Sequence, residues 1–157
     1  LLTSAELATW KPLAKLGPEP LTADFTVDGF EKALRHRRAP IKNVLLCQEV
    51  VVGLGNIYTD ESLFQAGINP LCPANSLSLP QIKTLWSTIR ATLTAAIDYG
   101  GTTFSDFINA DGATGSFQER LLVYGRKGLE CKHCGVELEG CRLAGRSTVY
   151  CPKCQPL

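Results

Sequence analysis

Four cysteines near the C-terminal end form the clearest group of residues that could do chemistry. They stand as two Cys-x2-Cys pairs, Cys131 with Cys134 and Cys151 with Cys154. Each pair can bend so that both sulfurs point to one centre, and two such knuckles supply the four thiolates that tetrahedral Zn²⁺ prefers. With four cysteine ligands no position stays open for a catalytic water. The sequence therefore predicts one structural zinc ion.

The alternative for these cysteines is a pair of disulfides in a secreted module. Three further cysteines, Cys47, Cys72 and Cys141, bring the total to seven. The odd total, and the lack of a signal-peptide pattern at the start of the sequence, favour an intracellular, reducing compartment such as a bacterial cytoplasm or nucleoid. No apolar run approaches the roughly 18 residues that span a bilayer, so we expect no membrane partner.

Charge is unevenly distributed along the 157 residues, although the formal net charge is only +1. Basic residues gather in two stretches, 31–43 and 120–157, and acidic residues dominate between them. Two basic patches on an otherwise neutral chain are typical of a surface that binds a polyanion. Solvated surface charge is the alternative that charge alone leaves open.

A glycine turn is the second candidate site. Gly53 and Gly55 flank Leu54 directly before Asn56, where a helix is predicted to begin. The first N–H groups of a helix lack partners and carry partial positive charge, so a phosphate fits there. The turn matches neither nucleotide-binding glycine pattern, which favours a backbone phosphate of a nucleic acid. A plain joint between two helices is the alternative.

Arg146 is the third candidate. It lies between Gly145 and Ser147, in a predicted turn inside the zinc module. A hairpin tip that a metal makes rigid can present a guanidinium for two hydrogen bonds to one phosphate. An exposed arginine without a ligand is the alternative.

Apolar periodicity and capping residues predict a mainly helical chain that ends in a small β module. Asp28 can cap a helix over residues 29–37, and Ser78 with Gln81 forms a capping box for the longest helix, which Gly100 and Gly101 end. Other helices are expected over residues 40–47, 57–66 and 103–108, and strands over 122–124 and 147–150. The predicted fold is a helical bundle followed by a small β-hairpin zinc ribbon.

The run VVGLGNIYTDESLFQAGINP at residues 51–70 closely resembles the helix–two-turns–helix motif of the bacterial-type formamidopyrimidine-DNA glycosylases. The segments VYGRKG at 123–128 and GRSTVYCPKCQ at 145–155 are similar to the C-terminal end of the same family. The resemblance covers nearly all of residues 16–155. It implies a base-excision-repair enzyme that removes oxidised purines, such as 8-oxoguanine and formamidopyrimidines, from double-stranded DNA and cleaves the strand at the abasic site.

The resemblance also assigns roles to single residues. Lys42 and Asn56 would hold phosphates that flank the lesion, and Gly55, directly before Asn56, would belong to the same DNA-binding turn. Arg146 at the finger tip would hold another phosphate. Tyr58 would line the interior near the flipped nucleotide, and so would Glu61. Packing within the helix is the alternative for Tyr58 and Glu61.

A loop near residues 111–120 resembles the family's lid over the flipped base, where mostly backbone amides recognise the lesion. Gly115, Ser116 and Phe117 are the residues that we expect in this lid.

The family's nucleophile is an N-terminal proline followed by a glutamate, whereas this sequence opens with Leu1 and Leu2. We therefore expect a C-terminal part of such an enzyme that binds DNA as a monomer without catalysis. Its expected divisions are an interdomain linker at 1–20, the helix–two-turns–helix domain at 21–120 and the four-cysteine zinc finger at 121–157.

Two functions of other classes compete with this hypothesis. One is a stand-alone nucleic-acid-binding zinc-ribbon module, which the lid-like loop disfavours because a simple binder has no flipped base to cover. The other is a zinc-held protein-interaction domain, in which replacing Asn56 and Arg146 would leave partner binding intact.

Overall fold

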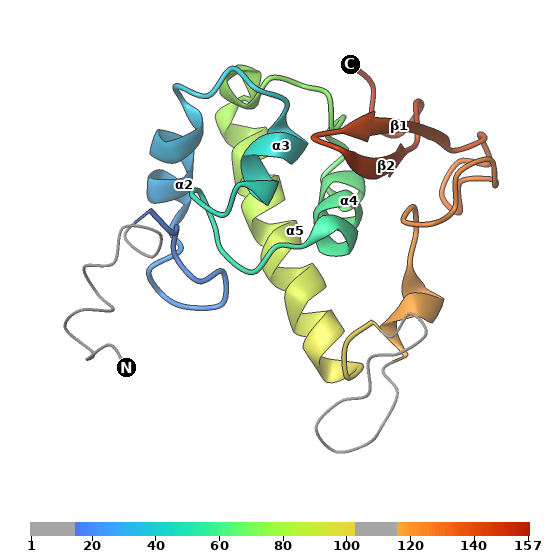
Figure 1. Ribbon diagram of the computed structural model, residues 1–157, viewed down its shortest axis with the longest axis horizontal. Helices are drawn as coiled ribbons and strands as arrows, with labels where there is room; N and C mark the ends of the chain where they lie inside the picture. Colours follow the sequence, from blue (N-terminus) through green and yellow to red (C-terminus); the bar gives the residue numbers. More distant parts are fainter. Residues whose placement is uncertain (1–14, 103–115) are drawn as a thin grey trace.

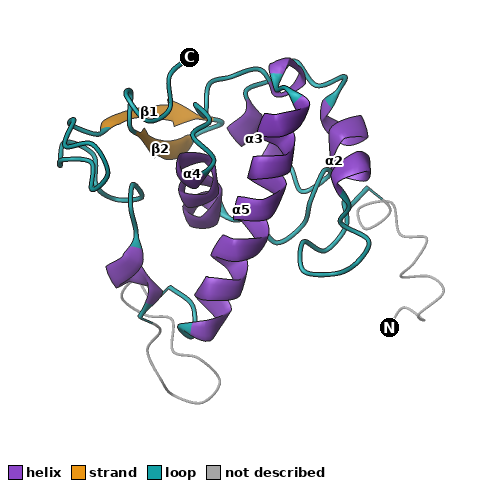
Figure 2. Ribbon diagram, turned by 180° about the vertical axis from the view of Figure 1, so that it is seen from behind, coloured by secondary structure: helices purple, strands orange, loops and turns teal. Residues whose placement is uncertain are grey.

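The computed structural model describes residues 15–102 and 116–157. Its elements are helices α2 (Val27–Leu34), α3 (Ile41–Leu46), α4 (Asn56–Gln65) and α5 (Leu79–Asp98), the short 3-10 helices η1 (Ala74–Ser76) and η2 (Phe117–Arg120), and strands β1 (Glu139–Leu143) and β2 (Arg146–Tyr150). Helix α5 runs through the middle of the molecule, α2 packs beside it, α3 packs against α4, and α4 lies between α5 and the β hairpin (Figure 1). Figure 2 shows the same arrangement from behind; within the described residues the hairpin is the only sheet. The predicted helical bundle followed by a β-hairpin ribbon is confirmed.

Helix α5 forms where its capping residues predict it. The Ser78 N–H donates to Gln81 Oε1 at 2.9 Å, which closes the capping box, and Pro80 occupies the first turn. Its buried face repeats at helical spacing and consists of Ile82, Leu85, Ile89, Thr92 and Ala96. Gly100 and Gly101 end the helix with φ of 70° and 86°, a conformation that favours glycine.

The cap of α2 differs from the prediction. Thr26 is the N-cap, and its hydroxyl oxygen accepts the Gly29 N–H at 3.1 Å. Asp28 lies within the first turn, where a carboxylate favours the positive end of the helix dipole without capping it. The helix also ends at Leu34, before the basic run that was expected to continue it. The predicted helix over 103–108 lies outside the described residues.

Helix α4 is buried on two faces and joins two hydrophobic cores. Leu63 is part of the main core between the helices, whose largest members include Phe25, Phe30, Leu45 and Leu85. Phe64, the next residue, belongs instead to the core of the zinc ribbon, together with Val123 and Leu138. Every residue from Thr59 to Phe64 is buried, so α4 presents no polar stripe to solvent.

The predicted strand at 122–124 is absent, and Glu61 explains why. The Glu61 carboxylate accepts the backbone N–H groups of Leu122, Val123 and Tyr124, each at 2.9 Å. A side chain of α4 thus satisfies the donors that a β-ladder would otherwise use. The apolar character of this segment reflects burial, since Val123 is 0% exposed in the ribbon core.

Strands β1 and β2 form an antiparallel hairpin in which Leu143 is paired with Arg146. The two residues of its turn, Ala144 and Gly145, have φ of 47° and 72°. Positive φ at both positions is typical of the tight turn that matches the twist of a hairpin. The turn places Arg146 at the tip, as the first residue of β2.

Candidate functional site

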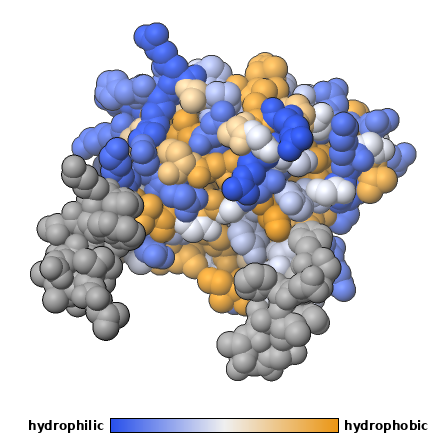
Figure 3. Space-filling view, viewed as in Figure 1, coloured by the Kyte–Doolittle hydropathy of each residue, from blue (hydrophilic) through white to orange (hydrophobic). Residues whose placement is uncertain are grey.

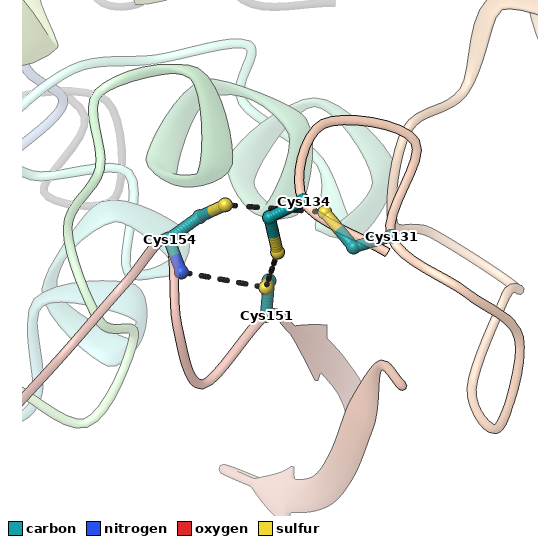
Figure 4. A group of neighbouring side chains, drawn as sticks. All are labelled: Cys131, Cys134, Cys151 and Cys154. Atoms are coloured by element: carbon teal, nitrogen blue, oxygen red, sulfur yellow. Dashed lines mark hydrogen bonds between the residues drawn. The ribbon is translucent and has the colours of Figure 1, made fainter. Parts of the chain in front are cut away.

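The four predicted zinc ligands converge on one point. Their sulfur atoms all lie within 4.8 Å of one another, and they come from the loop before β1 and the loop after β2 (Figure 4). The Sγ atoms of Cys131 and Cys154 are 3.9 Å apart, and those of Cys134 and Cys151 are 3.4 Å apart. Thiolates about 2.3 Å from a tetrahedral Zn²⁺ stand about 3.8 Å apart, so the cluster fits one zinc ion. All seven cysteines are free, so the disulfide alternative is wrong.

The second zinc knuckle is fastened to the helical part through Gln155. Its side-chain oxygen accepts the Cys151 N–H at 2.9 Å, and its side-chain nitrogen donates to the Ile68 carbonyl at 2.8 Å. The Asn69 side chain donates to the Gln155 carbonyl at 2.8 Å. These bonds are buried, because Gln155 and Asn69 are 1% and 3% exposed. The ribbon therefore has a fixed position on the turn that follows α4.

The glycine turn and the hairpin tip meet at one cavity of about 650 Å³. Gly55 and Asn56 line it from the start of α4, and Arg146 lines it from the hairpin. The remaining lining residues are Asn43, Leu46, Cys47, Gln48, Gly53, Leu54 and Ala144. The glycine turn and Arg146, two candidates that the sequence singled out separately, thus share one cavity.

The cavity is suited to an anion. Arg146 is the only charged residue among those that line it. No side chain within the described part of the chain caps α4, so the N–H groups of its first turn and the positive end of its dipole face the glycine turn. Gln48 holds the backbone of this turn, since its side chain accepts the Gly53 N–H at 2.7 Å and donates to the Leu54 carbonyl at 2.8 Å.

Lys42 does not lie where a direct phosphate contact would need it. The side chain is 0% exposed, its ammonium lies 2.7 Å from Asp60 Oδ1, and it donates to the Ser147 carbonyl at 2.8 Å. Asn56 Nδ2 donates to the same carbonyl at 3.0 Å. The expectation of a Lys42–phosphate contact is therefore corrected, because the ammonium is already bound within the protein.

Burial moves both partners of this ion pair toward their neutral forms. Desolvation raises the pKa of Asp60 from 3.8 to about 6, against the opposing effect of the Lys42 charge. Desolvation also lowers the pKa of Lys42, with the attraction of Asp60 acting in the opposite direction. For both groups, the cost of burying the charge therefore exceeds the attraction of the partner.

Tyr58 and Phe117 lie away from this cavity, near the end of α5. Their rings meet edge to face with centroids 5.8 Å apart, and the Tyr58 hydroxyl lies 3.2 Å from Thr102 Oγ1. Ser116 pairs with Thr102 through the backbone, whereas Gly115 lies outside the described residues. Tyr58 also lines a second cavity of about 350 Å³ at the C-terminal end of α5, where hydrophobic surface gathers in Figure 3.

Asp60 is the residue of this site that the sequence interpretation missed. Its second oxygen accepts the Val149 N–H at 3.2 Å, so it binds both Lys42 and β2. Its position four residues after Asn56 places both on one helix face, a spacing that could have indicated a shared partner. Glu61 was predicted near the flipped nucleotide and is instead 2% exposed, with its carboxylate bound to the segment after η2.

The chain matches two known family models. Residues 16–108 match the model of the formamidopyrimidine-DNA glycosylase H2TH domain, and residues 128–157 match a zinc finger found in FPG and IleRS. A formamidopyrimidine-DNA glycosylase of Xanthomonas campestris pv. campestris (strain B100) is 48% identical over 155 residues, which cover 99% of this chain and 57% of that protein. One of Acinetobacter baylyi is 49% identical over 147 residues, which cover 94% and 54%.

Solved structures give the same result. The crystal structure of MutM (FPG) from Thermus thermophilus has a TM-score of 0.87 and 44% identity, covering 91% of this chain and 55% of that one. The Lactococcus lactis Fpg in complex with abasic-site DNA has a TM-score of 0.91 and 38% identity, covering 99% and 57%. This chain spans about half the length of the relatives that it matches. It belongs to the formamidopyrimidine-DNA glycosylase family, of which it carries the H2TH domain and the zinc finger.

Proposed function

We propose that this chain supplies the DNA-binding part of a base-excision-repair glycosylase and AP lyase that removes oxidised purines. The observation that carries the proposal is the shared cavity, which Gly55 and Asn56 line from the N-terminal end of α4 and Arg146 lines from the hairpin. A guanidinium, a carboxamide and an uncapped helix start on one cavity form a site for a backbone phosphate. Solved relatives support it, since Lactococcus lactis Fpg was crystallised with DNA that contains an abasic site or Fapy-dG.

The cavity would bind DNA and perform no amine chemistry. None of the residues that line it is a lysine, the residue whose side-chain amine forms a Schiff base with a carbonyl group such as that of an abasic sugar. We therefore assign it to gripping the strand next to the lesion. Borohydride trapping that linked an abasic duplex to a cavity residue would contradict this assignment.

The remaining proposed features concern the lid and the setting. We assign Tyr58, Ser116 and Phe117 to the support of a lid over the flipped base, because their contacts connect η2 to α4 and to the end of α5. Free cysteines throughout favour a reducing compartment. No helix among residues 15–102 and 116–157 is both long and apolar enough to cross a membrane.

The test is the affinity for a duplex with a central abasic-site analogue, measured by fluorescence anisotropy at several salt concentrations. Arg146→Ala and Asn56→Ala should each weaken binding by roughly tenfold or more, because each removes a hydrogen bond to a charged group. Arg146→Ala should also lower the salt slope by about 0.9, the value for one phosphate contact.

Arg35→Ala is a matched control, because Arg35 is exposed at the C-terminal cap of α2 and pairs with Glu31, and neither residue lines the cavity. Its affinity and salt slope should stay close to those of the unmodified chain. The proposal fails if the chain does not bind duplex DNA, or if both cavity variants bind as tightly as the control. Intact binding of a protein partner by those same variants would point to a protein-interaction domain instead.

A further inference from the structure

The buried Lys42–Asp60 pair lies at the junction of α3, α4 and β2, where Lys42 and the cavity residue Asn56 donate to the same Ser147 carbonyl. Lys42 comes from α3 and Asp60 from α4, and both side chains are buried completely or almost completely, at 0% and 1% exposure. In Figure 1 the three elements lie together at the inner side of the hairpin. A charged pair in such a place needs an explanation, because desolvation offsets much of its attraction.

The two side chains hold the main chain of β2. The Ser147 carbonyl accepts from Lys42 Nζ at 2.8 Å, and the Val149 N–H donates to Asp60 Oδ2 at 3.2 Å. Residues 147 and 149 point these groups to the same edge of β2, the edge away from β1. Side chains of α3 and α4 thus occupy the position that a third strand would take.

Both DNA-facing residues of the proposed function depend on this same stretch of backbone. Arg146 directly precedes Ser147, so fixing the Ser147 carbonyl fixes the point from which the guanidinium extends. Asn56 Nδ2 donates to that carbonyl as well, at 3.0 Å. The Ser147 carbonyl therefore links the hairpin tip to the turn before α4.

We infer that Lys42 is a positioning residue: its buried ammonium holds the start of β2, and hence the Arg146 guanidinium, beside the turn that precedes α4. Lys42 acts on DNA through Arg146 and contacts no phosphate. The energetics agree, since burial lowers the pKa of Lys42 and raises that of Asp60. The best-attested role of buried polar and charged groups is to fix one geometry and not to add stability. The inference rests on the proposed DNA-binding function.

A double-mutant cycle separates positioning from direct contact. The unmodified chain, Lys42→Met, Arg146→Ala and the combined variant are compared in two quantities. These are the affinity for the abasic-site duplex and the slope of that affinity with salt concentration on logarithmic axes. A positioning residue loses its effect once Arg146 is gone, so the combined variant should bind within about twofold of Arg146→Ala and keep its salt slope. If Lys42 touched a phosphate, the combined variant would lose roughly a further tenfold and about 0.9 in slope, and the inference would be overturned.

Lys42→Met alone leaves the Asp60 carboxylate buried without its partner, so a second variant guards against misfolding. Lys42→Met with Asp60→Leu removes both charges, and such replacements of buried pairs keep folded proteins. This variant should keep its thermal midpoint and still lose affinity by roughly tenfold, the factor expected for Arg146→Ala. Affinity equal to that of the unmodified chain would overturn the inference, because the pair would then not position Arg146.

Two further measurements complete the test. Lys83→Met removes one positive charge from the exposed surface of α5 and should leave affinity unchanged within about twofold. In free protein, the amide signals of Ser147 and Val149 should shift in Lys42→Met and stay unchanged in Lys83→Met. The proposed function fails if the unmodified chain binds no DNA or if Arg146→Ala does not change its affinity. If both behave as expected but the affinity losses of Lys42→Met and Arg146→Ala add in the combined variant, only the positioning role fails.

Discussion

Replacing Glu61 should cost stability in proportion to the backbone donors that it leaves without an acceptor. Its carboxylate accepts three N–H groups, with Oε2 bound to Leu122 and Oε1 bound to Val123 and Tyr124. A hydrogen bond to a charged group contributes about 1.5–3 kcal/mol, and one between neutral groups about 0.5–1.5 kcal/mol. Because the carboxylate is 2% exposed, water cannot replace it without a local opening.

Glu61→Gln keeps the acceptor at Oε1 and places an amide NH2 opposite the Leu122 N–H. It should lose one charged bond outright and weaken two, a total of about 3–5 kcal/mol. For a chain of this length that corresponds to a fall of roughly 6–20 °C in the midpoint of thermal unfolding. Glu61→Ala leaves all three donors without an acceptor and should cost at least about 2 kcal/mol more.

Urea and thermal unfolding, followed by circular dichroism, measure both variants. Glu137→Gln is the matched control, because Glu137 is exposed in the ribbon and should change stability by less than about 0.5 kcal/mol. The reasoning is refuted if Glu61→Gln unfolds like the control, or if Gln and Ala cost the same. Unchanged stability with a large loss of DNA affinity would return Glu61 to the neighbourhood of the flipped nucleotide.

Three further outcomes are expected. Removing zinc with a chelator should unfold the ribbon while the α5 helical signal persists, and should abolish the contribution of Arg146 to duplex affinity; metal release and far-ultraviolet circular dichroism measure this. Burial raises the pKa of Asp60 from 3.8 to about 6, so on acidification the folded state binds a proton at Asp60 before the unfolded state does. Lowering the pH from 7 to 4 should therefore increase the free energy of unfolding, relative to that of Asp60→Asn, by roughly 2–3 kcal/mol. A shift of opposite sign would show that the Lys42 charge dominates. Gly17→Ala should cost about 1–3 kcal/mol in urea unfolding, because a Cβ there would lie 2.6 Å from the backbone carbon of Val50.

Features that short stretches of sequence determine could be predicted. The cluster of four cysteines follows from two pairs with fixed spacing, and α5 from a capping box, a helical apolar repeat and two terminal glycines. Arg146 was placed correctly at a hairpin tip, because Gly145 indicates a tight turn. In each case the information lies within a few residues of the feature.

Features that depend on distant partners could not be predicted in this way. Lys42 was expected at a phosphate because of the family resemblance, but the Ser147 carbonyl that accepts its hydrogen bond is 105 positions away in the sequence. Leu122 to Tyr124 were expected to form a strand because they are apolar, while their N–H groups bind Glu61 more than 60 positions earlier. The apolar residues 122–124 indicate burial but name no hydrogen-bond partner, and nothing near Lys42 in the sequence indicates that it is buried. Only the tertiary structure shows which polar group satisfies the buried atoms.

Zinc and α4 determine different parts of the DNA-binding geometry. The metal fixes the ribbon internally, since its four ligands lie on the two loops that flank the hairpin. It does not set the distance from Arg146 to the glycine turn, because that turn leads into α4, whose first residue Asn56 binds the hairpin at the Ser147 carbonyl. A variant that keeps its zinc and loses Lys42 should therefore retain a folded ribbon and still bind DNA weakly. That combination separates the rigidity of the finger from its orientation, and only the orientation brings the two sides of the cavity to one phosphate.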